Sequence, residues 1–250
     1  MGGAHDFALF TSTSYLAHDR ACSLLPRHFA RLRTAHAALA KELPESWCAR
    51  VGMSTDVQMQ DELDRAVKEA RANGNEGDLR IRLSILSTGA PKAETFPLTP
   101  TPSYPVRLVL DDGPTRYDEP FLRYKTSQRA VYDDARARRG ATLYPSPAAS
   151  DPPFDVLLFN PSSQVTEATI SNVAFRLSGD ARDPFVTPRT ECGLLEGVMR
   201  AELLERREVV EGAVTVEQVK EAARRGTLEI ICFNGVRGVF PAYISPDDLE

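Results

Sequence analysis

Two periodicities alternate along the chain and predict a mixture of strands and helices. Residues 79–86 alternate between apolar and polar side chains, which is typical of a strand with one buried face. Between residues 24 and 39, apolar side chains recur every three or four positions and predict a helix with one apolar face. Similar patterns predict strands over 7–15, 106–110, 156–159, 171–176, 184–187, 228–233 and 239–244, and helices over 60–73, 127–139, 193–207 and 216–225.

Breaks in these patterns indicate how the chain is organised. Five prolines between residues 90 and 105 predict an extended connector, because a regular element does not readily accommodate them. Residues 111–122 are the expected crossing between two domains. The order of strands and helices shows no strict βαβ alternation, so the pattern favours an α+β fold.

Composition narrows the class of protein. The 250 residues are 42% hydrophobic, enough for a substantial core, and the net charge of -5 offers no basic face for a nucleic acid or an anionic membrane. The four cysteines form no CxxC pair, and the four histidines lack metal-ligand spacing. We therefore expect no metal, no membrane partner, free thiols, a cytoplasmic location and a small-molecule ligand.

Two ionisable residues stand in distinctive surroundings. Lys125 follows apolar and aromatic residues in FLRYKTSQRAVYDDARARRG, and Glu167 lies in DVLLFNPSSQVTEATISNVAF. Either residue alone is usually a solvated surface charge. They gain meaning from a series of motifs in a fixed order: LFTSTSY, RHFARL (27–32), RIRLSILSTG (80–89), the Lys125 segment, VTEATISNVAF (165–175), FVTPRTECGLLEGVMR (185–200) and CFNGVRG (232–238).

With these motifs, the chain from about residue 6 onward resembles the class IV aminotransferases, the fold-type IV pyridoxal phosphate (PLP) enzymes with a D-amino acid aminotransferase-like fold. The resemblance implies a small N-terminal α/β domain over 1–110, a linker over 111–122 and a larger C-terminal pseudo-barrel domain over 123–250. It places PLP in the cleft between the domains and implies a homodimer. Phe96, Leu98 and Tyr104, in the proline-rich stretch, support the dimer indirectly.

The resemblance also implies roles for single residues. Lys125 forms a Schiff base with the PLP aldehyde and then serves as general base and acid, and Glu167 keeps the pyridine nitrogen protonated. Arg31 binds the phosphate together with the amides at a helix start. The remaining cofactor contacts implied are Ser171, Asn172, Gly197, Val198, Met199, Asn234 and Gly235, with Met199 replacing the threonine usual in the family. His28, in the same motif as Arg31, is expected to pack or cap.

Within the family, the details most resemble the fungal 4-amino-4-deoxychorismate lyases. Arg129 follows the lysine by four positions, Met199 replaces threonine, and the NGVRG ending departs from the transaminase pattern. We therefore expect a lyase that forms 4-aminobenzoate and pyruvate in folate precursor synthesis. Its anionic amino substrate carries two carboxylates and requires cationic donors. The candidate contacts are Thr11, Arg129 and Arg237, with Arg80 and Arg82 as further cations.

Two alternatives stay open. An aminotransferase of the same fold would use Lys125 and Glu167 in the same way but would release a keto product. A PLP-fold binding protein with little activity would retain the scaffold alone.

Overall fold

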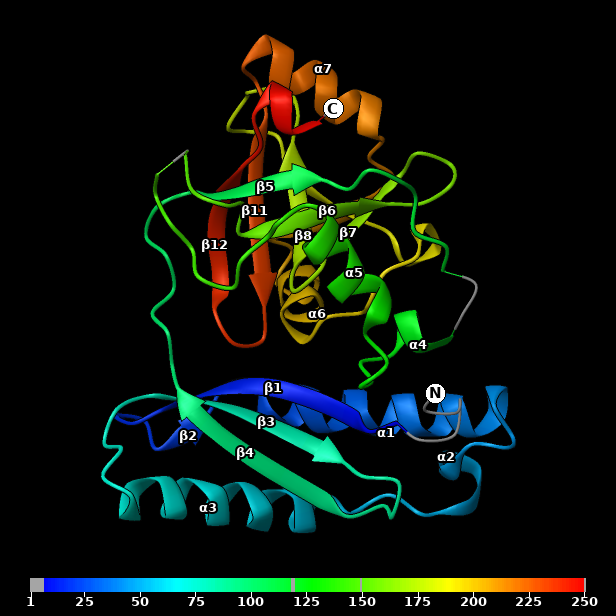
Figure 1. Ribbon diagram of the computed structural model, residues 1–250, viewed down its shortest axis with the longest axis vertical. Coiled ribbons are helices and arrows are strands. Elements are labelled where there is room, and N and C mark those ends of the chain that lie inside the picture. Colours follow the sequence, from blue (N-terminus) through cyan, green and yellow to red (C-terminus); the bar gives the residue numbers. More distant parts are fainter. Residues whose placement is uncertain (1–6, 118–119, 149, 250) are drawn as a thin grey trace. The chain divides into compact units, whose positions relative to one another are not determined.

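The computed structural model describes residues 7–117, 120–148 and 150–249. It divides into two compact units, coloured along the sequence in Figure 1. Unit 1 comprises Met1–Pro100 and Tyr124–Gln128, and unit 2 comprises Thr101–Arg123 and Arg129–Glu250. Residues 101–110, assigned above to the N-terminal domain, lie in unit 2, because Val106–Leu110 pairs with strands of its sheet. Residues 1–6 of that expected domain lie outside the described residues.

Unit 1 contains a four-stranded antiparallel sheet with the order β2-β1-β3-β4. Its strands are β1 (Leu9–Leu16), β2 (Ala21–Cys22), β3 (Leu79–Ile85) and β4 (Pro91–Pro97). The alternation that predicts a strand over 79–86 is confirmed, since Leu79, Ile81, Leu83 and Ile85 are all buried.

Three helices accompany this sheet: α1 (Leu25–Glu42), α2 (Trp47–Arg50) and α3 (Asp56–Ala72). The apolar face predicted for the first helix is buried, with Phe29, Leu32 and Leu39 inside. A capping box between Thr55 and Gln58 fixes the start of α3. Helix α1 packs against β1, and α3 packs against β4.

The connector predicted over residues 90–105 is wrong for its first half, which forms β4. Pro91 and Pro97 are the end residues of this strand, and β4 is at the edge of the sheet. An edge strand tolerates proline because the N–H groups on its outer side have no ladder partner to lose. The number of prolines alone therefore does not distinguish an extended connector from an edge strand.

Unit 2 contains an eight-stranded sheet with the order β10-β9-β8-β11-β12-β5-β6-β7. Its strands are β5 (Val106–Leu110), β6 (Asp155–Phe159), β7 (Val165–Ala168), β8 (Asn172–Arg176), β9 (Phe185–Pro188), β10 (Val209–Gly212), β11 (Glu229–Asn234) and β12 (Gly238–Tyr243).

The large sheet curls until its two edges meet. The backbone N–H of Val165, in edge strand β7, donates to the carbonyl of Val214, just after edge strand β10, at 2.8 Å. The N–H of Val216 donates back to Ser163 at 2.9 Å. This curled sheet and the smaller sheet of unit 1 confirm the α+β architecture with a pseudo-barrel.

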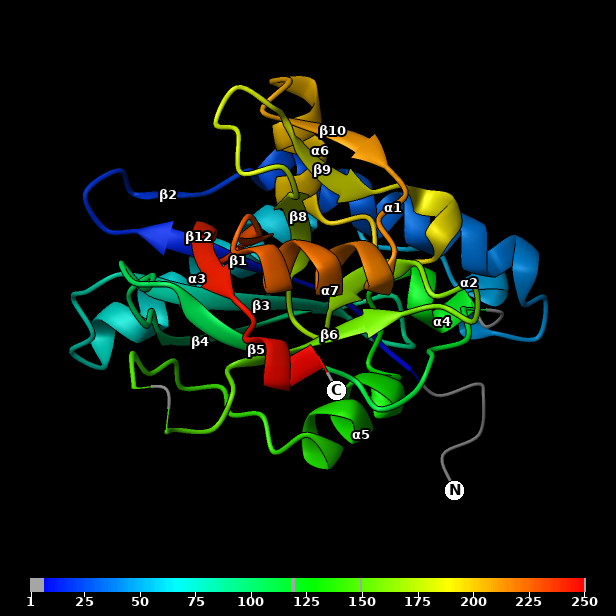
Figure 2. The ribbon, with the colours of Figure 1, turned by 90° about the horizontal axis from the view of Figure 1, so that it is seen from above.

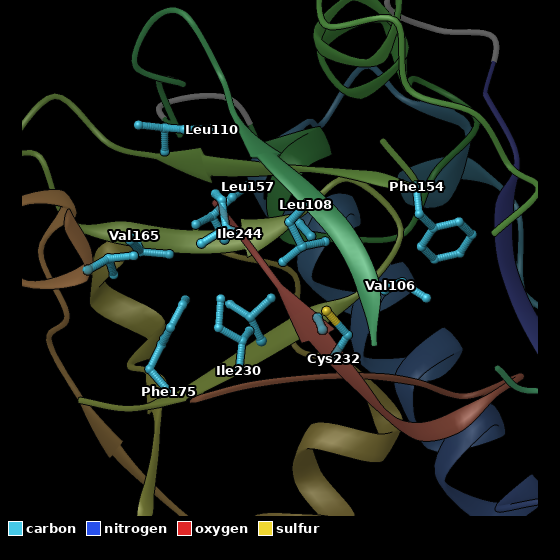
Figure 3. Packing of buried hydrophobic residues seen from close by; sticks show 14 of the residues in the cluster. Val106, Leu108, Leu110, Phe154, Leu157, Val165, Phe175, Ile230, Cys232 and Ile244 are labelled. Atoms are coloured by element: carbon cyan, nitrogen blue, oxygen red, sulfur yellow. The ribbon is translucent and has the colours of Figure 1, made fainter. Parts of the chain in front are cut away.

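The core of unit 2 lies inside this curl. Figure 3 shows Leu108, Leu157, Ile230 and Ile244 directed toward one another, and all four are buried. Unit 2 also contains α4 (Pro120–Arg123), α5 (Ala130–Arg138), α6 (Val198–Glu205), α7 (Val216–Arg225) and short 3-10 helices at Thr190–Cys192 and Pro246–Leu249. Helix α7, orange in Figure 2, buries Val219 against this core.

Candidate active site

In unit 1, the segment that carries Lys125 is hydrogen-bonded to the start of β1. The N–H of Phe10 donates to the carbonyl of Lys125 at 3.0 Å, and Leu9 forms an antiparallel bridge with Thr126. The Lys125 backbone is therefore fixed by the sheet. Its side chain is half-buried, with Nζ 5.0 Å from the centroid of the Phe10 ring.

A polar cluster of Thr11, His28 and Arg31 lies between β1 and α1. Oγ1 of Thr11 lies 2.5 Å from Nδ1 of His28 and accepts a hydrogen bond from Nη2 of Arg31 at 2.6 Å. Among the described residues, Nε2 of His28 and Nε of Arg31 are buried without a hydrogen-bond partner. Buried polar atoms normally have partners, so these two are candidates for ligand contacts.

Burial sets the charge state of this cluster. Burial, followed by the charges of Arg31 and Lys125, lowers the pKa of His28 from 6.5 to about 3, so its imidazole is neutral at physiological pH. Burial also lowers the pKa of Arg31 to about 10, which leaves its guanidinium charged at neutral pH. Unit 1 thus brings two cations, Arg31 and Lys125, close to one neutral imidazole.

Two further arginines of β3 stack on aromatic rings in unit 1. The guanidinium carbon of Arg82 lies 4.0 Å from the centroid of the Phe10 ring, and that of Arg80 lies 4.4 Å from the centroid of Phe96. Arg82 and Lys125 therefore share one aromatic neighbour. The positive charge expected for an anionic substrate is concentrated around Phe10.

In unit 2, Glu167 is a buried carboxylate on β7, only 3% exposed. Its Oε1 accepts hydrogen bonds from the Tyr132 hydroxyl at 2.9 Å and from the Leu195 N–H at 3.1 Å. Such donors favour the charged form of a carboxylate. The two donors therefore favour the anion of Glu167 and restrict the position of its Oε1.

Two tyrosines flank this carboxylate: Tyr132 is buried and Tyr117 is half-buried. Tyr132 contacts Glu167 itself, and the Tyr117 hydroxyl lies 2.9 Å from Oγ1 of the adjacent Thr166. Burial, and next the charge of Glu167, raise the pKa of both tyrosines well above its ordinary value. Sequence reasoning missed Tyr132 and Tyr117. The sequence signal for Tyr132 was its helical spacing: it lies three residues before Ala135, so both side chains lie on the same, buried face of α5.

The turn that follows Glu167 is anchored from α5. The carbonyl of Thr169 accepts a hydrogen bond from Nη2 of Arg129 at 2.8 Å, and its hydroxyl accepts from Arg136 at 2.9 Å. Arg136 also pairs with buried Asp155 at 3.0 Å. Arg129, a predicted substrate contact, thus uses its guanidinium inside unit 2, where it also lies over the Tyr132 ring at 4.5 Å.

Asn172 and Glu167 together hold the loop before α6. Asn172 donates through Nδ2 to the carbonyl of Leu195 at 2.8 Å, while the Leu195 N–H donates to Glu167. A Cβ at Gly197 would lie 2.0 Å from Oδ1 of Asn172, so this close approach requires glycine. Two predicted cofactor residues, Asn172 and Gly197, are therefore in contact.

The helix predicted over 193–207 begins later than expected, at Val198. Gly193 has a φ of 86°, and a Cβ there would lie 2.5 Å from Cγ of Tyr117. This backbone conformation is not helical, which delays the start of α6. Gly197 becomes the N-cap and has no side chain with which to cap the helix.

The start of α6 has the features of an anion-binding helix end. The amides of Val198 and Met199 lie in the first turn, where N–H groups have no intrahelical acceptor and the helix dipole is positive. The Met199 side chain packs against an apolar cluster that includes Leu203 and Phe233. The backbone therefore supplies the donors here.

The NGVRG loop is tied to the turn after Glu167. Oδ1 of Asn234 accepts hydrogen bonds from the amides of Val236 at 3.0 Å and Arg237 at 2.9 Å. Its Nδ2 lies 3.3 Å from Oγ of Ser171. Gly235 lies within this loop, and Arg237 stacks over Phe154 at 5.3 Å. Unit 2 thus gathers the predicted residues Glu167, Ser171 and Asn234.

Among the residues that the structure describes, no group of three His, Cys, Asp or Glu side chains could hold a metal ion. Within the same ranges, no helix is both long and apolar enough to cross a membrane. The cysteines Cys22, Cys48, Cys192 and Cys232 are free.

The fold and the motifs point to the class IV aminotransferase family, and the comparisons agree. The chain belongs to the class IV amino-transferase family, whose model matches residues 8–243. A protein of Schizosaccharomyces pombe (strain 972 / ATCC 24843), provisionally named aminodeoxychorismate lyase, is 31% identical over 232 residues, covering 92% of this chain and 87% of the relative.

Solved structures show the same fold. A provisionally named amino-acid aminotransferase from Mesorhizobium loti superposes with a TM-score of 0.76 at 26% identity, covering 96% of this chain and 100% of that one. The 4-amino-4-deoxychorismate lyase from Pseudomonas aeruginosa superposes with a TM-score of 0.64 at 23% identity, covering 95% of this chain and 83% of that one.

Proposed function

We propose that this chain is a PLP-dependent lyase that converts 4-amino-4-deoxychorismate to 4-aminobenzoate and pyruvate, a step toward folate precursors. The observation that carries this proposal is Glu167, a buried carboxylate in a class IV aminotransferase fold that accepts hydrogen bonds from two donors, which favour its anion. Such an anion suits a cofactor whose ring nitrogen must stay protonated. The Schizosaccharomyces pombe relative, named for this lyase, supports the choice of reaction.

The residues present fit PLP. Lys125 supplies the amine for the covalent bond to the aldehyde, and Glu167 supplies the acceptor for the ring N–H. The buried Nε of Arg31 and the first-turn amides of Val198 and Met199 are donors suited to a phosphate dianion. When bound, PLP supplies an electron sink for negative charge that develops on the substrate carbon attached to the amine.

The chain's own residues perform the proton transfers and the substrate binding. Once the substrate amine has displaced it, the Lys125 amine would take a proton from the substrate carbon and would pass a proton to the departing enolpyruvyl group, which leaves as pyruvate. Departure of the enolpyruvyl group leaves an aromatic ring, which drives the reaction forward.

The substrate carries two carboxylates, and the cations proposed to bind them are Arg237, Arg80 and Arg82. Thr11 is a further polar contact. Arg129 acts indirectly, through Thr169 and Tyr132.

An aminotransferase is the second candidate, because the Mesorhizobium loti structure named for that activity is 26% identical over its whole length. Both reactions use Lys125 and Glu167 alike. An aminotransferase needs a keto acceptor in a second half-reaction, whereas the lyase needs none. Incubation with 4-amino-4-deoxychorismate alone should therefore release stoichiometric pyruvate. The presence of both Lys125 and Glu167 argues against a binding protein without activity.

The lysine assignment is tested by the mass of the intact protein after borohydride reduction. The parent should carry one PLP adduct, mapped by peptide sequencing to Lys125. Lys125→Ala should keep the fold and lose the adduct, while Lys92→Ala should keep both. An adduct that persists in Lys125→Ala, or maps to Lys41, Lys68 or Lys220, would overturn the assignment.

We further propose that the working unit is a homodimer in a reducing compartment such as the cytoplasm. Four free cysteines support the compartment, because thiols without disulfide partners suit a reducing environment. The exposed Phe96 supports the dimer, since large apolar side chains at a surface often mark contacts.

A further inference from the structure

Tyr132 lies in the first turn of α5, seven residues after Lys125, and is 4% exposed. We propose that Tyr132 is a positioning residue that holds the Glu167 carboxylate charged and in a fixed orientation through a hydrogen bond to Oε1. The inference rests on the proposed function in one respect, that the Glu167 carboxylate binds the cofactor ring nitrogen. It adds a residue seven positions beyond the lysine to the machinery of the reaction.

The Tyr132 hydroxyl has one proton and two acceptors within reach. Oε1 of Glu167 lies at 2.9 Å, and the carbonyl of Leu122 lies at 3.3 Å. A carboxylate is the stronger acceptor, and the shorter distance favours it further. The proton is therefore directed to Glu167, and the contact with Leu122 is secondary.

The second donor to the same oxygen is the Leu195 N–H at 3.1 Å. Two donors, one from α5 and one from the loop before α6, converge on Oε1 and restrict its position. The carbonyl of Leu195 is bound to Asn172, so the loop is itself held. Without the Tyr132 hydroxyl, Glu167 would keep only the Leu195 donor of this pair. Its carboxylate would then bind a proton more readily.

Several ionisable groups of unit 2 surround this contact. Tyr117, from the segment before α4, and Arg129, at the N-cap of α5, act electrostatically on Tyr132. The Arg136–Asp155 pair binds the turn after Glu167 through Thr169. Burial raises the pKa of Tyr132 well above its ordinary value, so its hydroxyl remains a donor throughout the pH range of the test.

The test uses the cofactor-free protein labelled with 15N-leucine. Because the Leu195 amide donates to Glu167, its chemical shift should report the protonation of that carboxylate as pH changes. We expect the midpoint for Tyr132→Phe to move to higher pH than in the parent. Tyr117→Phe is the control: it removes the hydroxyl of the neighbouring half-buried tyrosine, which binds Thr166 instead, and its midpoint should stay near that of the parent. Equal midpoints for Tyr132→Phe and Tyr117→Phe would overturn the proposal.

A second variant covers the case in which Tyr132→Phe fails to fold. Site-specific 3-fluorotyrosine at position 132 keeps the ring and makes the hydroxyl a stronger donor. The Leu195 midpoint should then move the other way, to lower pH. An unchanged midpoint, or one moved to higher pH, would contradict a hydrogen bond to Glu167.

Kinetics of the PLP-loaded enzyme then separate positioning from packing. Tyr132→Phe should lower kcat about tenfold with little change in KM, as expected for one lost hydrogen bond to a charged group. The acid limb of the kcat profile should shift to higher pH. In a Glu167→Gln background, Tyr132→Phe should have little further effect; full additivity of the two changes would sink the proposal.

The two proposals fail in different ways. Absence of a PLP adduct on Lys125 would refute the proposed function but would leave the Leu195 titration intact. Conversely, an unmoved Leu195 midpoint with a normal adduct would refute only the role of Tyr132.

Discussion

His28 is buried as a neutral imidazole beside Thr11, and this has a consequence for acid stability. The pKa of His28 is about 3 in the folded protein, whereas its ordinary value, which applies to the unfolded chain, is 6.5. Between these two pH values the unfolded chain therefore binds more protons than the folded protein. The contribution of His28 to the free energy of unfolding is therefore complete above pH 6.5. It is lost as pH falls toward 3, by up to about 1.4 kcal/mol per pH unit.

We predict that His28→Asn flattens this pH dependence. Asparagine keeps a polar group near the position of Nδ1 but takes up no proton, so the free energy of unfolding should fall less between pH 7 and pH 5 than in the parent. Urea unfolding at each pH measures it. His18→Asn is the control, because the His18 side chain is 74% exposed. Parallel curves for parent and His28→Asn would contradict the buried neutral state.

Arg31 offers a second test through cofactor affinity. Arg31→Ala should raise the PLP concentration for half-saturation about tenfold to a hundredfold, because a charge-assisted hydrogen bond contributes about 1.5–3 kcal/mol. Arg33→Ala, two residues along the same helix and paired with exposed Asp56, should leave it unchanged. Fluorescence titration of the cofactor-free proteins gives both values. Equal affinities for the two variants would place the phosphate elsewhere.

Motif reasoning found the charged side chains of the candidate site, Lys125, Arg31 and Glu167, because their chemistry is visible in the sequence. It did not find Leu195, which contributes only backbone N–H and C=O groups. It also missed Tyr132, since the sequence does not reveal which buried tyrosine faces a given carboxylate. The structural role of Arg129 in holding Thr169 was hidden for the same reason.

Helices and strands with a strong period were predicted well, and their exceptions have physical causes. Residues 216–225 form α7 as expected, with a capping box at Thr215 and Gly226 at its end. Strand β4 was missed because its prolines are tolerated only at a sheet edge. Strands β7 and β10 were also missed.

The loop between Gly193 and α6 is sensitive to a single added methyl group. Gly197→Ala places a Cβ against Oδ1 of Asn172, which must then release the Leu195 carbonyl. We expect a loss of about 1–3 kcal/mol in the free energy of unfolding and weaker PLP binding. Chemical denaturation and cofactor titration measure the two effects.

Two further variants make that prediction specific. Gly113→Ala, where a Cβ would meet nothing within 4 Å, should be close to neutral. Adding Asn172→Ala to Gly197→Ala should relieve the clash and recover part of the stability. If Gly197→Ala is as stable as Gly113→Ala, the close approach is not a constraint.

For the molecule as a whole, the sequence predicted two parts but not how the chain divides between them. Tyr124–Gln128 belongs to unit 1 although both flanking segments belong to unit 2, because its backbone pairs with the start of β1. Long-range pairings of this kind leave no local pattern. The curl that brings β7 to the segment after β10 is equally invisible in the sequence.

Assembly of two chains is the remaining prediction. Phe96 is 38% exposed beneath the guanidinium of Arg80, in the stretch proposed to meet a second subunit. Light scattering at micromolar concentration should give twice the chain mass of 27.6 kDa. Phe96→Glu should shift the protein toward the monomer and lower activity, while the new carboxylate can pair with Arg80 and preserve the fold. Val57→Glu, on the exposed face of α3, is the control and should remain dimeric. A monomeric parent with full activity would rule out an active site completed by the second subunit.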